Sequence, residues 1–267
     1  MNFLTLNSPS ETRTKVDIDD NNSYFLNSFV KINGTEMLSS IELNKLTSRL
    51  RVDRERVVRE YYELIILNEI SGFSWSSFII FKGGTSLRLA YGSPRFSDDL
   101  DFSLIQKINS REIFSSVRKI ASKYHFEISD LWEKKNTILA EFKISDKNLP
   151  QNIRLKIEIS RRILPSEHSE LKVISSETCP LNVLSRVMKL EYILEEKLKA
   201  LGSRTDPRDL FDIFFISQKM NRDFNNINSN VNTKRFKRRE IVQTLRKYLP
   251  TNWYGIIDEI IKKIEGN

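Results

Sequence analysis

The stretch FKGGTSLRLAYGSPRFSDDLDF, residues 81–102, joins a pair of glycines to an acidic strand. Gly83 and Gly84 follow the apolar run FIIF, so the chain can turn there into a helix that continues through LRLAY. Free backbone amides at a helix N-terminus attract phosphate oxygens, and Thr85 adds a hydroxyl donor. The spacing matches neither a Walker loop nor a dinucleotide-binding fingerprint, and a glycine pair by itself is usually only a turn.

Three aspartates follow this turn, at positions 98, 99 and 101. Side chains two residues apart share one face of a strand, so Asp99 and Asp101 point the same way, together with Ser97. Asp98 points the other way, and we expect it to be solvated. Two carboxylates about 7 Å apart repel each other unless a cation lies between them, so the pair suits a divalent metal ion. The alternative is that these acids are only the solvated face of the strand.

A third carboxylate comes from NIRLKIEISRR, residues 152–162, whose alternating pattern also predicts a strand. Its apolar side chains share one face, and Glu158 lies on the other. If this strand lies next to the acidic strand with polar faces matched, Glu158 falls beside Asp99 and Asp101. Three carboxylates can hold two Mg²⁺ ions, which prefer oxygen ligands and bridge carboxylates to phosphates. A Cys/His zinc site is not expected, because the chain has one cysteine and two histidines.

Hydrophobic periodicity predicts an α+β fold, in which a small mixed β-sheet is flanked by helices and followed by a C-terminal helical domain. The expected parts are a flexible N-terminal arm over 1–35, a core with N-terminal helices over 36–180, and the helical domain over 181–267. Two further strands are predicted over 126–133 and 137–145, with a hairpin turn between them. Helices are predicted over 41–71 (two helices), 110–125, 182–204, 206–220 and, as the final one, 239–250.

The chain carries 43 Lys and Arg against 35 Asp and Glu, a formal net charge of +8 that favours a polyanionic partner. The run KRFKRRE, residues 234–240, could grip a phosphate backbone while its aromatic ring stacks on a base, although a solvated helix start explains the run equally well. The candidate RNA-binding residues are Lys234, Arg235, Phe236, Lys237, Arg238 and Arg239. No apolar run approaches the roughly 18 residues that cross a bilayer, so we expect a cytoplasmic protein without membrane contact.

One lysine in the helical half lies on an apolar face. On a helical wheel of residues 183–204, Lys197 lies among leucine and isoleucine side chains, where an ammonium group needs an anion. A bound triphosphate would supply that anion, and an interhelical salt bridge would do so equally well. Asp206 is the expected N-cap of the next helix, and Asp209 either caps that helix or pairs with Lys197 or Arg204.

The combination of glycine pair, acidic strand and later acidic strand resembles the DNA polymerase β-like nucleotidyltransferase superfamily. Within it, the quoted stretch looks like the AbiEii/AbiGii toxin family, whose first motif reads Gly-Gly-Thr, a helix, then Arg-x-Ser-x-Asp-Leu-Asp-Phe. The matching residues after the helix are Arg95, Ser97, Asp99, Leu100, Asp101 and Phe102. EEKLKALGSRTDPRDLFDIFFI, residues 195–216, is similar to the later motif of the family. The resemblance spans about residues 55–216, and the fourteen residues between Gly84 and Asp99 exceed the usual spacing of the superfamily.

The resemblance implies an Mg²⁺-dependent nucleotidyltransferase that uses a nucleoside triphosphate. Asp99, Asp101 and Glu158 would hold the metal, and Glu158 would also act as the base. The residues implied in nucleotide binding are Gly83, Gly84, Thr85, Arg95, Ser97, Lys197 and Asp209. The implied acceptor is RNA, with the 3′ end of tRNA as the best-supported class, and the implied setting is a toxin–antitoxin or phage-defence system with a cognate antitoxin. Two alternatives stay open: a protein or small hydroxylated acceptor, and a non-catalytic basic RNA-binding module.

Overall fold

The computed structural model describes residues 29–32, 35–224 and 235–265, and the chain divides into two compact units, Met1–Ser39 and Ser40–Asn267. In the first unit, β1 (Phe29–Ile32) and β2 (Thr35–Leu38) pair as antiparallel strands. Paired strands therefore stand at the end of the segment that the sequence suggested as a flexible arm. Residues 1–28 lie outside the described part.

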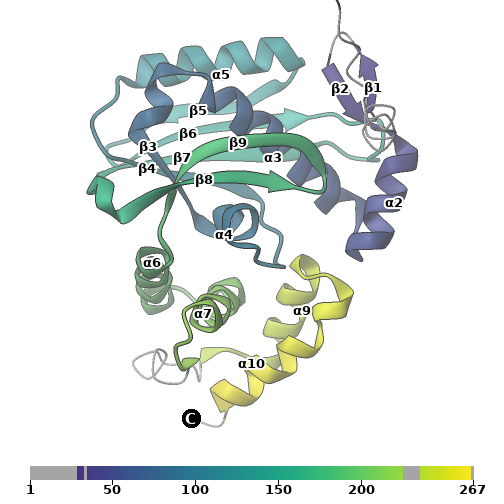
Figure 1. Cartoon of the computed structure of the whole chain (residues 1–267), viewed down its shortest axis with the longest axis vertical. Helices are drawn as coiled ribbons and strands as arrows, with labels where there is room; N and C mark the ends of the chain where they lie inside the picture. Colours follow the sequence, from purple (N-terminus) through teal and green to yellow (C-terminus); the bar gives the residue numbers. More distant parts are fainter. Residues whose placement is uncertain (1–28, 33–34, 225–234, 266–267) are drawn as a thin grey trace, which may run out of the picture. The chain divides into compact units, whose positions relative to one another are not determined.

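The second unit is built on a seven-stranded mixed sheet with the order β5-β6-β7-β4-β3-β9-β8 (Figure 1). Its strands are β3 (Ile79–Lys82), β4 (Asp99–Leu104), β5 (Glu127–Glu133), β6 (Thr137–Ile144), β7 (Ile153–Ile163), β8 (Ser169–Ser176) and β9 (Cys179–Met188). β4 runs parallel to β7 and β3 runs parallel to β9, whereas the other neighbouring pairs are antiparallel. The predicted mixed sheet is confirmed, and the acidic strand β4 lies at its centre.

The register of the three central strands brings charged residues to one level of the sheet. Alternate residues of β4 and β7 are buried, so the polar residues between them share the other face. Asp101 of β4 pairs with Glu158 of β7 on one side and with Lys82 of β3 on the other. The expected neighbourhood of Glu158 and the aspartates is therefore present.

Helices cover the sheet and also form a group of their own at one end of the unit (Figure 1). They are α2 (Ser40–Leu50), α3 (Arg54–Ser71), α4 (Gly83–Tyr91), α5 (Ser110–Tyr124), α6 (Leu190–Ser203), α7 (Pro207–Lys219), α9 (Arg238–Tyr248) and α10 (Gly255–Glu265). α3 packs against β9 and α5 against β5 and β6, while α7 packs against α6, α9 and α10. None of the helices in the described ranges is long and apolar enough to cross a membrane.

The helical half shares its hydrophobic core with the elements on either side of the glycine turn. Ile80 of β3 and Leu87 of α4 belong to the same buried apolar cluster as the residues of α6, α7, α9 and α10. Burial of this shared apolar surface fixes the helices against the turn. The separation of a helical domain from residue 181 onwards stays a prediction.

Several elements differ from the sequence prediction, among them β8, over which no strand was predicted. Residues 182–188 are not helical, because β9 continues to Met188 and pairs with β8 as an edge hairpin. Val183, Leu184, Val187 and Met188 have helix-like spacing, and the pairing of β9 with β8 and β3 decides for a strand. α10 was missing from the prediction, although its buried residues Ile257, Ile260, Ile261 and Ile264 repeat with helical period.

Candidate active site

The glycine turn is shaped by two close approaches. Gly83 has φ +80°, and a Cβ added there would lie less than 3.0 Å from the Asp101 carboxylate. A Cβ on Gly84 would meet the Arg95 guanidinium and would lie 2.7 Å from Oγ of Ser97. Both positions therefore require glycine, because the N-terminus of α4 lies directly against the acidic strand.

The carboxylates of β4 and β7 share one lysine as counter-ion. Nζ of Lys156 lies 3.3 Å from Oδ2 of Asp99 and 3.5 Å from Oε2 of Glu158. Burial, followed by the charges of Asp99 and Glu158, raises the pKa of Asp101 to about 6. Burial also raises the pKa of Asp99, and the Lys156 ammonium partly offsets that effect. The cluster thus holds more negative charge than its own cations neutralise.

This donor set fits Mg²⁺ in chemical kind. Mg²⁺ prefers carboxylate oxygens, and burial with two neighbouring carboxylates raises the pKa of Asp101 in spite of the charges of Lys82 and Lys156. Within residues 29–32, 35–224 and 235–265, no three carboxylate, imidazole or thiol side chains converge on a single point. The carboxylate oxygens that could bind Mg²⁺ are those of Asp99 and Asp101 on β4, and Glu158 lies next to them on β7.

Two residues expected to bind the nucleotide instead support the turn. The Thr85 hydroxyl is buried and donates to the Asp99 carbonyl at 2.5 Å. Arg95 is 2 % exposed and donates from Nε and Nη2 to the carboxylate of Asp212 at 2.7 and 2.8 Å. Protein acceptors thus already take up these donors, and contact of the two side chains with phosphate stays a prediction.

Lys197 finds its anion within the protein. Its Nζ lies 2.8 Å from Oδ1 of Asp209 and 2.7 Å from Oδ2 of Asp212. Asp209 also accepts a hydrogen bond from Nε of Arg204 at 2.8 Å. Burial opposes ionisation of Asp212, yet Arg95 and Lys197 outweigh it and lower the pKa of Asp212 to about 2. Of the two alternatives left open by the sequence, the salt bridge is the one present.

Asp212 was not among the predicted site residues. It is fully buried and joins Arg95, beneath the glycine turn, to Lys197 of α6. Its position three residues after Asp209 was the available signal, because the two residues share one face of α7. A second residue that the sequence did not indicate is Lys82, whose Nζ lies 2.9 Å from Oε2 of Glu196 on α6.

Asp98 is not a solvated surface residue, as the sequence had suggested. It pairs with the buried Arg56 of α3, and it accepts a hydrogen bond from the Tyr248 hydroxyl of α9 at 2.6 Å. Arg208 of α7 lies 3.6 Å away. Burial opposes its charge, but Arg56 and the Tyr248 hydroxyl hold the pKa of Asp98 below its usual value. The residue before the acid pair therefore joins three helices to the acidic strand.

The predicted RNA-binding run has a mixed outcome. Phe236 is 9 % exposed and belongs to the apolar cluster of the helical half, so its ring is packed inside the protein. Arg235 donates to the Leu201 carbonyl, and Arg238 pairs with Asp258 at 2.9 Å. Both Lys237 and Arg239 are exposed, and Lys234 lies outside the described residues.

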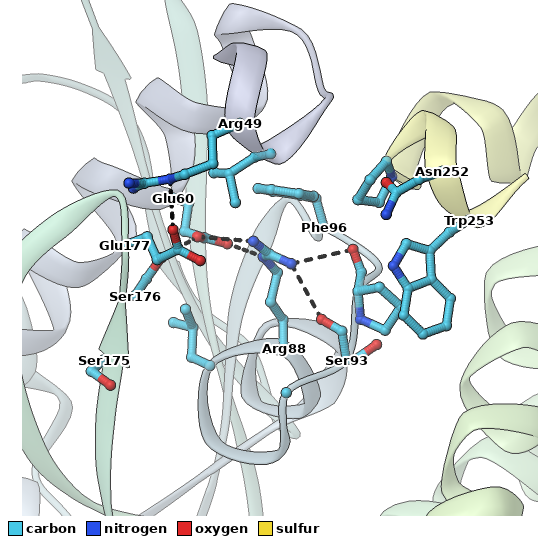
Figure 2. Close-up of a pocket in the computed structure, with 15 residues that line it drawn as sticks. Arg49, Glu60, Arg88, Ser93, Phe96, Ser175, Ser176, Glu177, Asn252 and Trp253 are labelled. Carbon is cyan, nitrogen blue, oxygen red and sulfur yellow. Dashed lines mark hydrogen bonds and ion pairs between the residues drawn. The ribbon is translucent and has the colours of Figure 1, made fainter. Parts of the chain in front are cut away.

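A cavity of about 630 Å³ lies near the C-terminal end of α4 (Figure 2). Arg88 extends into it and donates to the Glu60 carboxylate and to the carbonyls of Ser93 and Pro94, so its donors are satisfied. None of the residues of the acid cluster or the glycine pair lines this cavity. We therefore place the candidate active site at the N-terminal end of α4.

Comparison with known proteins adds a family and a fold. Residues 65–252 match the family model described as nucleotidyl transferase AbiEii toxin, type IV TA system. JHP933 from Helicobacter pylori is 23% identical, with 80% of this chain and 95% of that chain covered and a TM-score of 0.50. A structure described as a candidate nucleotidyltransferase from H. pylori is 21% identical, with coverages of 77% and 95% and a TM-score of 0.49. No protein of curated function matches the chain.

Proposed function

Because the chain belongs to the AbiEii family of nucleotidyl transferase toxins, we propose that it transfers a nucleoside monophosphate from a nucleoside triphosphate to an RNA acceptor. The acceptor we propose is the 3′ end of a tRNA, within a toxin–antitoxin or phage-defence system that includes a cognate antitoxin. One observation carries the proposal: Asp99 and Asp101 share a strand face, in register with Glu158, against the N-terminus of α4.

The triphosphate is proposed to bind at the start of α4. The backbone amides of Gly83 and Gly84 provide donors at the positive end of the helix, and Ser97 lies close by. Lys82 and Lys156 add positive charge on either side of Asp101. These groups would orient the α-phosphate towards the acid cluster.

Asp99 and Asp101 would hold Mg²⁺, and the bound ion would supply positive charge to the reacting phosphate. Glu158 would accept the proton of the acceptor hydroxyl, whose oxygen then bonds to the α-phosphorus. The bond between that phosphorus and the bridging oxygen of the β-phosphate breaks, and pyrophosphate leaves with the electron pair. No covalent enzyme intermediate is needed.

Lys197 is proposed to act by positioning rather than by direct contact with phosphate. Its ammonium holds Asp212, which in turn fixes Arg95 beneath Gly84. Asp209 is proposed to have the same positioning role, because its carboxylate also binds the Lys197 ammonium.

The reaction is tested with each α-³²P-labelled nucleoside triphosphate, Mg²⁺ and total RNA. We expect label on RNA of tRNA size, its loss with EDTA, and at least about a hundredfold decrease for Asp99→Asn/Asp101→Asn, since charge stabilisation by such groups is worth several kcal/mol. Glu127→Gln/Asp130→Asn removes two exposed acids from one edge strand and should keep the activity. Absence of Mg²⁺-dependent label on RNA would refute the proposal, and label on protein would select a protein acceptor.

A further inference from the structure

Two basic cavities meet at the end of α9. One, of about 530 Å³, lies between the start of α7 and α9 and is lined by Arg204, Arg208 and Lys247. The other, of about 430 Å³, lies between the turn after α2 and the end of α9 and is lined by Arg51, Arg246 and again Lys247. Both cavities are lined by Lys247, and we refer to the two together as the basic track.

Three cations of this track are available to a ligand. Arg51, Arg246 and Lys247 are exposed, and none of them forms an ion pair with another residue of the described ranges. Arg204 and Arg208, by contrast, share their charge with Asp209 and Asp206. The lining of both cavities contains six basic and two acidic residues, so it favours a polyanion.

The track is tied to the acidic strand. The Tyr248 hydroxyl, one residue after Lys247, donates to Asp98 at 2.6 Å, and Nη1 of Arg208 lies 3.6 Å from the same carboxylate. Asp98 directly precedes Asp99, the first residue of the acid pair. Although Asp98 and Asp99 point to opposite sides, the charge of Arg208 also acts on Asp99 and opposes the rise of its pKa, so the Arg208 end of the track is the one near the acid pair.

The fold fixes the backbone at the far end of the track. Arg51 adopts the left-handed conformation, with φ 56°, and its carbonyl accepts a hydrogen bond from the backbone amide of Thr251 at 3.1 Å. An arginine in this conformation costs about 1 kcal/mol or more, so the fold determines where the residue stands. This fixes the backbone position from which the exposed Arg51 side chain extends.

We propose that this track binds the phosphodiester backbone of the single-stranded 3′ segment of the RNA acceptor. Its cations are Arg204 and Arg208 in the first cavity, Arg51 and Arg246 in the second, and Lys247 in both. The inference rests on the proposed function and assigns the acceptor contact to the end of α9, not to the run Lys234–Arg239 at its beginning. Arginine and lysine contacts to phosphate read no sequence, so the track fixes orientation and leaves base selection to other contacts.

The cavity of Figure 2 does not continue this track. Leu249 and Thr251 line the second cavity of the track, whereas Pro250 and Asn252 line the cavity of Figure 2. Consecutive residues thus line different cavities, and the segment 249–252 separates the cavity of Figure 2 from the second cavity of the track. A single strand that follows the cations stays on the α9 side.

The test compares binding of 5′-labelled tRNA and of a short single-stranded RNA to the full chain and its variants by fluorescence anisotropy. Arg246→Gln/Lys247→Gln should raise Kd about tenfold and lower the slope of log K against log salt by about 1–2. Lys262→Gln/Lys263→Gln removes the same charge from the last turn of the equally long α10 and should leave Kd within about twofold. Nucleotide affinity should stay unchanged in both.

Arg51→Asn provides a second variant on another element, because asparagine tolerates the left-handed conformation. It should raise Kd by a similar factor. Wild-type affinity for RNA in both track variants, or a larger loss in Lys237→Gln/Arg239→Gln, would overturn the inference. RNA binding that depends on the track, without any label transfer by the wild type, would instead leave the track standing and refute the proposed reaction.

Discussion

Asp101 is a carboxylate whose ionisation is unfavourable in the folded protein. It lies beside Asp99 and Glu158, and its pKa is raised from 3.8 to about 6. Since protons bind the folded form more tightly, the stability contributed by this group is full below its unfolded pKa and is lost as pH rises through 6. At neutral pH the Asp101 carboxylate is therefore ionised and can bind a cation, and its ionisation lowers the stability of the fold.

The first prediction follows from this sign. In EDTA at about pH 7.5, Asp101→Asn should raise Tm by about 2–6 °C, because it removes the cost of a confined charge. The gain should shrink as pH falls through 6 and vanish only at about pH 2.5, well below the unfolded pKa of 3.8, where the wild-type carboxyl is protonated in both states. Calorimetry across this pH range measures it, and an unchanged or lowered Tm at pH 7.5 would contradict it.

Asp212 has the opposite character, because it is buried between Arg95 and Lys197 and its pKa is lowered to about 2. The second prediction is that Asp212→Asn destabilises the fold by about 3–5 kcal/mol, since two buried cations lose their counter-ion. Urea denaturation provides the measurement. Glu195→Gln, which breaks an exposed pair with Lys199 at 3.7 Å, should change stability by less than about 0.5 kcal/mol. Equal effects of the two substitutions would contradict the assignment.

At this scale the sequence indicates which residues belong to the site, but it does not show which acceptors their hydrogen-bond donors have. Alternation put Glu158 beside the aspartates on the condition that the two strands are neighbours, and the structure pairs Asp101 with Glu158. Thr85 and Arg95 match the same motif, yet their donors are occupied by the Asp99 carbonyl and by Asp212. The alternation of β4 could not show that Asp98 meets Arg56 and Tyr248, because those partners come from distant parts of the chain.

At the scale of one element, the start of α4 is the critical structure. The third prediction is that Gly83→Ala decreases label transfer by at least about tenfold, because a Cβ there needs a strained φ of +80° and displaces the Asp101 carboxylate. Gly202→Ala is the matched control. A Cβ at Gly202, within α6, meets nothing within 4 Å, so alanine should keep activity and raise stability by about 0.4–1 kcal/mol. Full activity of Gly83→Ala would contradict the close approach.

Strands and helices with a strong apolar pattern of their own could be predicted from the sequence. The hairpin of β8 and β9 at the edge of the sheet could not. The apolar alternation of β6 and β7 and the capping signal of Asp206 before Pro207 matched the structure. The span 182–188 did not, because apolar spacing alone cannot separate a buried strand from a helix, and its partner β8 has no clear alternation of its own.

At the scale of the whole molecule, the sheet carries the acidic residues of the candidate site, and ion pairs with the helical half hold the residues around them. Lys82 to Glu196 links β3 to α6, and Arg95 to Asp212 links the glycine turn to α7. Such contacts join residues more than a hundred positions apart, so motif spacing could not predict them. The basic track adds a surface beside the same carboxylates, consistent with the net charge of +8.

The central claim is that the acid pair of β4 adds nucleotides to the 3′ end of RNA. The most direct measurement is mass spectrometry of purified tRNA incubated with nucleoside triphosphates, Mg²⁺ and either the wild type or Asp99→Asn/Asp101→Asn. We predict a mass gain of whole nucleoside monophosphate units, confined to the 3′-terminal fragment and present only with the wild type. An unchanged tRNA mass, or an equal gain with the double variant, would contradict the claim.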